Sequence, residues 1–111
     1  MDVDAAFAHG LRLAREGRYF EAHEAFEEAW RAAAADERDF FQGLVHVAVA
    51  WYQAGRGRRP GCERQLEKAE RRLAPFAPAH RGVDVESVLA QVADARAIVA
   101  GGSLRLPPVR L

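Results

Sequence analysis

The chain has 111 residues, of which 50% are hydrophobic and 29% are charged, and its 16 basic and 16 acidic residues give a formal net charge of zero. This length allows one domain with a single core, and the composition is typical of a folded globular protein. A neutral chain has no overall attraction to nucleic acid or to an anionic membrane, so we expect neither as a partner.

Cysteine content and hydropathy indicate the cellular compartment of the protein. Cys62 is the single cysteine, which excludes an intrachain disulfide and a zinc site made of several cysteines. No run of about 18 apolar residues that could cross a membrane occurs, and the acidic start MDVDAAFAHG does not have the form of a signal peptide. These features predict a cytoplasmic protein.

The first two expected helices form a hairpin. Residues 4–15 carry apolar side chains at i, i+4 and i+7, and Gly17 can take the left-handed conformation that ends a helix. Residues 19–34 carry a second apolar stripe at helical spacing, which consists of Tyr19, Ala22, Phe26, Ala29 and Trp30.

The third expected helix, residues 37–54, is the centre of the fold. Asp36 is its predicted N-cap, and apolar side chains cover well over half of its circumference, so several elements should contact it. Gly43 in its middle costs about 1 kcal/mol relative to alanine. We expect a neighbouring helix to approach closely there, with the ring of Trp30 as one candidate for the contact.

Two further helices complete the expected domain. Pro60 suits the first turn of a helix over residues 61–73, prolines then interrupt the chain, and Asp84 caps a helix over residues 85–100. Gly101 and Gly102 end that helix.

The predicted fold class is therefore all-α, a single compact domain of about five helices packed around a central apolar helix. It spans residues 1–103. Residues 104–111 form a proline-containing C-terminal tail that either packs along the surface or frays. The predicted core is dominated by aromatic residues and one leucine, namely Phe20, Phe26, Trp30, Phe40, Phe41, Leu44 and Trp51.

Polar side chains at one edge of the second expected helix form a candidate site. His23 and Glu27 are i, i+4 neighbours beside the apolar stripe, where an imidazole and a carboxylate could bind a metal ion or transfer a proton. The third helix contributes a glutamine and a second imidazole. The candidate pocket consists of His23, Glu24, Glu27, Trp30, Gln42 and His46, and the ligands of any metal would be His23, Glu27 and His46.

A structural role fits the same residues better. A half-buried His–Glu pair more often holds two helices together than binds a ligand, and the Glu-x-x-His and His-Glu-x-x-His metal signatures are absent. The two serines have no setting that suits a nucleophile, and the chain contains no threonine. The catalytic residues, any metal and any cofactor therefore stay unknown at this point.

One stripe of the third helix could face another chain. Gln42, His46, Val49 and Gln53 recur at i, i+4, i+7 and i+11, opposite the densest apolar face. Such a stripe fits a dimer seam or intramolecular packing better than a ligand pocket.

Basic residues gather in the loop at 55–61 and in the helix that follows. Glu63, Glu67 and Glu70 alternate with these bases at spacings that form ion pairs within a helix, and no aromatic side chain is present among them to stack on a nucleobase. The pattern predicts a salt-bridged surface, and nucleic-acid binding is not expected.

The strings GRYFEAHEAFEEAW, ERDFFQGLVHVAVAWYQ, ERQLEKAERRL and GVDVESVLAQV resemble a small bacterial and archaeal helical family known as domain of unknown function 309. The resemblance covers residues 6–97, and its most specific parts are EAHE at 21–24 with Trp30, and QGL at 42–44. It implies a compact, self-associating helical domain and supplies no catalytic assignment.

Two hypotheses about function follow. The first is a cytoplasmic helical domain that acts by self-association, as a homo-oligomer such as a dimer, or by binding a protein partner. The alternative is a small metal- or ligand-dependent enzyme, hydrolase-like, with His23 and Glu27 at its site. The sequence leaves open whether the protein is an enzyme.

Overall fold

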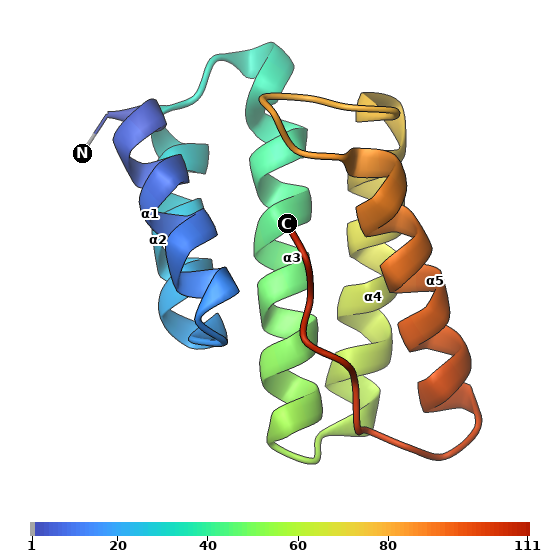
Figure 1. The fold of residues 1–111 in the computed structure, drawn as a ribbon. Coiled ribbons are helices and arrows are strands. Elements are labelled where there is room, and N and C mark those ends of the chain that lie inside the picture. Colours follow the sequence, from blue (N-terminus) through green and yellow to red (C-terminus); the bar gives the residue numbers. More distant parts are fainter. Residues whose placement is uncertain (1) are drawn as a thin grey trace.

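A central helix, α3 (Arg38–Gly55), runs through the middle of the molecule, with α1 and α2 on one side and α4 and α5 on the other (Figure 1). This computed structural model describes residues 2–111. The other elements are α1 (Val3–Arg15), α2 (Tyr19–Ala32), the 3-10 turn η1 (Ala35–Glu37), α4 (Arg59–Leu73), the 3-10 turn η2 (Ala74–Phe76) and α5 (Val85–Ala100). The predicted all-α fold of five helices is confirmed.

Local sequence signals set several helix ends. The side chain of Asp84 accepts a hydrogen bond from the backbone N–H of Ser87 at 2.9 Å, so the predicted cap of α5 is confirmed. Asp2 caps α1 in the same way. Gly17 has a φ of +76°, the left-handed conformation expected between α1 and α2.

The link between α2 and α3 differs from the prediction. α2 ends at Ala32, since Ala33 and Ala34 are extended, with ψ angles of 151° and 155°. Asp36 lies within η1 and is not the N-cap of α3, which Glu37 precedes. The alanine-rich run has high helix propensity, but the chain must turn there to bring α3 alongside α2, and tertiary packing overrides a weak local preference.

Most of the predicted core is confirmed. Phe26, Phe40, Phe41 and Leu44 are fully buried, and Trp51 is 5% exposed. Phe20 was expected in this core and is instead 49% exposed. It lies two residues before the buried Ala22, and at 100° per residue this places it on the opposite side of α2.

Gly43 contacts α4. A Cβ atom built on Gly43 would lie 2.6 Å from Cγ of Leu73, which explains why a residue without a side chain is needed at this point of α3. The ring of Trp30, the contact proposed from the sequence, lies elsewhere: it is only half-buried, and the guanidinium of Arg38 lies 4.6 Å from its centroid.

Two further features complete the described chain. Residues 104–111 pack along the surface, which is one of the two outcomes expected for the tail, and they cross α3 on the side of α1 and α5 (Figure 1). The carboxylate of Glu37 accepts hydrogen bonds from His80 Nε2 and Arg81 Nη2, both at 2.8 Å, and so joins the loop before α5 to the start of α3. Among the described helices, none is long and apolar enough to span a membrane.

Candidate functional site

The side of α3 that lies between α2 and α4 is incompletely covered. At positions i, i+4, i+7, i+11 and i+14, α3 has five side chains that share this side. The first is exposed, the third is buried, and the other three are partly exposed. We call this surface the open face, and it consists of Arg38, Gln42, Val45, Val49 and Tyr52.

Aromatic side chains from α2 extend the open face. The ring of Phe20 lies 5.2 Å from that of Tyr52 and 4.8 Å from that of His23, measured between centroids. At the other end of the helix pair, Trp30 packs under Arg38. Because α2 and α3 run in opposite directions, these two contacts align His23, Glu27 and Trp30 along one edge of the open face.

The predicted His23–Glu27 pair does not form. Nδ1 of His23 donates to the backbone carbonyl of Phe20, one turn earlier in α2. The carboxylate of Glu27 faces Arg31 at 3.9 Å. Each side chain therefore has a local partner on its own helix, and no contact between them favours a proton-transfer role.

His46 lies away from the other candidate residues. It is 8% exposed, and its Nδ1 donates to Oε1 of Gln65 on α4 at 2.7 Å. Burial lowers the pKa of His46 below its usual value, and the positive charges of Lys68 and Arg72 lower it further, so the imidazole is neutral at pH 7. His46 is thus a polar contact between α3 and α4.

The predicted stripe of α3 is therefore divided between two surroundings. His46 faces α4, and the side chain of Gln53 lies 3.3 Å from where a Cβ on Gly61 of α4 would be. Gln42 and Val49 remain partly exposed on the open face. Intramolecular packing, one of the alternatives drawn from the sequence, accounts for His46 and Gln53.

No metal site is evident among residues 2–111, since no group of three or more His, Cys, Asp or Glu side chains could hold a metal ion there. His23, Glu27 and His46, the predicted ligands, accordingly do not converge. The enzyme hypothesis stays a prediction that no geometric observation favours.

The two edges of the open face carry opposite charges. Along α2, Glu27 supplies negative charge one turn after His23, whereas Glu24, also predicted for the pocket, lines a groove toward α1 together with His9 and Leu13. Along α4, the charges of Lys68, Arg71 and Arg72 lie close enough to His46 to lower its pKa. The neutral net charge of the chain thus conceals an acidic edge and a basic edge on either side of α3.

Ion pairs on the outer side of α4 confirm the predicted salt-bridged surface. Arg59 pairs with Glu63 at 3.3 Å, and Arg71 with Glu67 at 3.9 Å, each within one helical turn. Arg72 reaches Asp39 of α3 at 2.7 Å. Exposed pairs of this kind contribute little stability.

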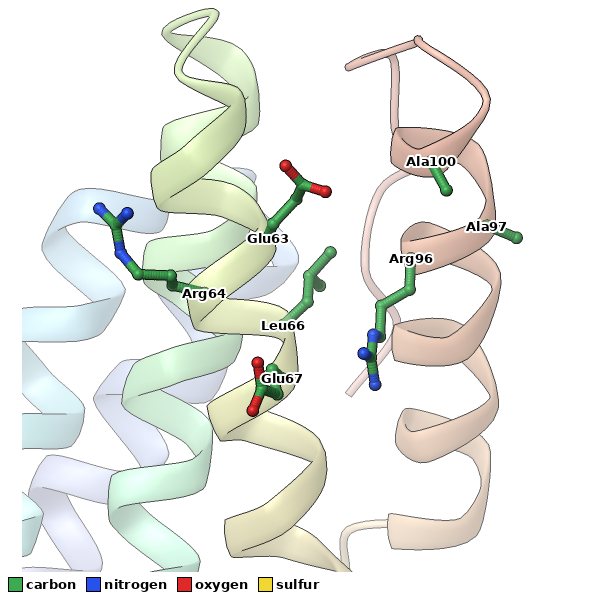
Figure 2. Close-up of a pocket in the computed structure, with 7 residues that line it drawn as sticks. All are labelled: Glu63, Arg64, Leu66, Glu67, Arg96, Ala97 and Ala100. Atoms are coloured by element: carbon green, nitrogen blue, oxygen red, sulfur yellow. The ribbon is translucent and has the colours of Figure 1, made fainter.

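A groove of about 470 Å³ separates α4 from α5. Glu63 of α4 points toward α5, whereas Arg64 points to the opposite side of α4 (Figure 2). Arg96 of α5, which also lines this groove, pairs with Glu70 at 2.9 Å. The groove mixes paired acidic and basic side chains, and it includes none of the residues predicted to form a site.

Part of the open face was not recognised from the sequence, because Phe20 was expected in the core and Tyr52 was not singled out as an exposed residue. A helical wheel of α2 contains the signal, since Phe20 falls outside the stripe formed by Ala22, Phe26 and Ala29. The charge of the two edges was visible in the sequence, but their placement on either side of α3 required the packing of the helices.

Comparison with known proteins identifies the family of this chain. A family model described as a domain of unknown function, DUF309, matches residues 7–65, which is more than half of the chain. Searches of curated proteins and of solved structures gave no match. The matched segment includes most of α1, all of α2 and α3, and about the first half of α4, and so all residues of the open face. The chain belongs to the DUF309 family.

Proposed function

We propose that this domain acts by self-association, with the open face packed against the open face of a second copy. The observation that carries the proposal is an exposed apolar and aromatic strip with an acidic edge on α2 and a basic edge on α4. Such a surface is complementary to itself, which is the requirement for a symmetric dimer.

The side chains on the open face are of the types that stabilise protein interfaces. Phe20 is the large hydrophobic residue that is most exposed, at 49%, and Tyr52 lies against it. Trp30 with Arg38 supplies a second aromatic contact and a guanidinium. Aromatic residues and arginine are enriched in interfaces and contribute most of the binding energy there. Val49 lies between these two clusters on α3 and would occupy the centre of the contact.

Charge complementarity selects the orientation of the second copy. A twofold axis parallel to α3 would place the α2 edge of each copy against the α4 edge of the other, so acidic residues would meet basic ones. A twofold axis perpendicular to α3 within the interface would instead place acid against acid.

The positions of charged residues along the axis of α3 determine which of them would meet across the interface. Glu27 lies about one turn from Trp30 at the Arg38 end, and Lys68 lies one turn from Arg72, which pairs with Asp39 at the same end. With the axis parallel to α3, Glu27 would face Lys68 of the partner subunit.

Val49→Asp tests the central contact. We expect the wild-type chain to be a dimer by native mass spectrometry and sedimentation, and the variant to be a monomer with an unchanged helical circular dichroism spectrum, because two carboxylates would be buried at the twofold axis. Ala90→Asp, an exposed position on α5, is the matched control and should remain a dimer. A monomeric wild type, or loss of the dimer in both variants, would contradict the proposal.

Charge reversal tests the orientation. Glu27→Lys and Lys68→Glu should each raise the dimer dissociation constant about 5- to 10-fold, the effect of a like-charge contact in an interface. Combining both changes in one chain should restore the affinity, since each new lysine would meet a new glutamate. If the two effects add instead of cancelling, the helices do not pair in this orientation.

A further inference from the structure

The tail is held by its main chain. Nε1 of Trp51 donates to the carbonyl of Pro107 at 2.8 Å, and the N–H of Val109 donates to the hydroxyl of Tyr19 at 3.4 Å. The side-chain amide of Gln91 bonds Arg110 twice: its Nε2 donates to the carbonyl at 2.9 Å, and its Oε1 accepts from the N–H at 2.7 Å. All four bonds use backbone atoms of residues 107–110.

Only one side chain of this segment is deeply buried. Val109 is 5% exposed, whereas Pro107, Pro108 and Arg110 are exposed. On either side of this segment, Leu104, Leu106 and Leu111 pack partly buried against the core. Main-chain hydrogen bonds combined with one apolar anchor are how grooves bind extended peptides, because such bonds are available to any sequence and the anchor supplies selectivity.

The buried polar groups of Gln91 and Trp51 find partners in the tail, and Nε2 of Gln91 also donates to Oγ of Ser87 at 3.2 Å. Gln91 is polar and 8% exposed on α5, and its amide bonds Arg110 in both directions. Trp51 is 5% exposed, and its indole N–H bonds the tail. Buried polar groups need such partners, and between α3 and α5 the backbone of the tail supplies them.

The consecutive prolines match this requirement. Pro107 and Pro108 favour an extended conformation and have no N–H to satisfy, and in the groove Pro107 contributes only its carbonyl. Gly102, with a φ of +96°, forms the turn between α5 and the tail, so the tail is not a continuation of the helix.

We propose that the groove between α3 and α5 is a peptide-binding site for an extended partner segment of the type Pro-Pro-apolar, and that residues 104–111 are its intramolecular competitor. This site is separate from the open face, because Trp51 follows Val49 by two residues and therefore lies on the opposite side of α3. The recognition of backbone atoms explains why a segment of another protein can replace the tail.

A full-length variant with a weakened competitor tests the proposal. Val109→Asp removes the apolar anchor from the tail and leaves the groove intact. We expect this variant to bind a labelled synthetic peptide of residues 103–111, measured by fluorescence anisotropy, at least about tenfold more tightly than the wild type, in which the attached tail competes at an effective concentration in the millimolar range. The same peptide with aspartate at the position of Val109 is the control and should not bind.

A second change identifies the groove. Adding Gln91→Ala to Val109→Asp should reduce binding of the peptide at least about tenfold, because two hydrogen bonds to the peptide backbone are lost. A folded Val109→Asp variant that does not bind the peptide, or binding that Gln91→Ala leaves unchanged, would overturn the proposal.

Hydrogen exchange of the wild-type protein provides a test that does not depend on the variants. We expect the amides of Val109 and Arg110 to exchange at least about 100-fold faster than those of Val92 and Val99 in α5, as a detachable segment requires. Equal protection of the tail and of α5 would overturn the proposal, since the tail would then open only when the whole domain unfolds.

Discussion

The two opposite faces of α3 differ in what covers them. On one face the tail covers Trp51, which is 5% exposed, and provides its indole with a hydrogen-bond acceptor. On the other, Val49 stays partly exposed beside Phe20, which is 49% exposed. A helix that is apolar over most of its circumference needs cover on every side, and four neighbouring helices do not supply it.

This difference shows which part of the apolar surface of α3 the chain covers with its own tail. The tail covers the face of α3 that contains the large indole of Trp51, where exposure would cost most. On the opposite face, α3 itself contributes smaller aliphatic and amphipathic side chains, and the exposed aromatic ring of Phe20 comes from α2. The uncovered face has acidic and basic edges that keep it hydrated in a single copy. The comparison predicts different consequences for truncating side chains on the two faces.

Trp51→Ala should cause the largest loss. Removing a buried tryptophan costs about 3–5 kcal/mol of unfolding free energy, and the tail would also lose its anchor to α3. Val49→Ala on the open face should cost less than about 1 kcal/mol, because little buried area is removed. Chemical denaturation of both variants at a concentration below that of self-association measures the contrast, and equal losses would show that the two faces are equally buried.

Glu37 lies on neither of these faces, and it should make a smaller, pH-dependent contribution to the free energy of unfolding. Hydrogen bonds from Arg81 and then from His80 lower the pKa of Glu37 from 4.5 to about 2, against the opposing effect of burial. A carboxylate with a depressed pKa stabilises the fold above pH 4.5, and this contribution decreases as the pH falls from 4.5 to 2.

We expect a loss of roughly 2 kcal/mol of unfolding free energy over that interval from this group. Glu37→Gln should lower the stability at pH 7 and remove this part of the pH dependence. Denaturation curves of both proteins between pH 7 and pH 2 provide the measurement, and parallel curves would show that Glu37 does not link the loop to α3.

Gly43→Ala should have the smallest effect, and it tests the side of α3 between the two faces. The new methyl group would lie 2.6 Å from Cγ of Leu73, which is 1% exposed and cannot move freely. Overpacking costs about 1–3 kcal/mol, and alanine recovers about 1 kcal/mol of helix propensity, so a net loss of about 1 kcal/mol is expected.

Gly55→Ala is the matched control at the end of the same helix. Nothing lies within 4 Å of the added methyl group there, so this variant should be unchanged or slightly more stable. If Gly43→Ala were equally harmless, α4 would not pack tightly on α3 at this point.

Much of the fold could be predicted because its signals are local. The spacing of apolar residues identified all five helices and the central place of α3, and Asp84 and Gly17 marked ends that the structure confirms. The exception comes from tertiary packing, which overrides a weak local preference. Ala33 and Ala34 have helix propensity, and yet they are extended because the chain turns between α2 and α3.

The candidate site could be predicted only in part. His23 lies beside Phe20 and Trp30 beside Arg38, at the two ends of the open face. Glu24 lines a groove toward α1 instead. His46 does not lie on the open face either, since the side of α3 on which it lies is occupied by α4.

By itself, the sequence determined where the helices are and which side of each is apolar, because side-chain direction within a helix repeats every 3.6 residues. Tertiary structure alone decided which polar groups meet: His46 with Gln65, Glu37 with Arg81, and Gln91 with the backbone of Arg110. The reason is physical. A polar side chain can be satisfied by many partners, and only the packing of distant segments brings one of them within hydrogen-bond distance.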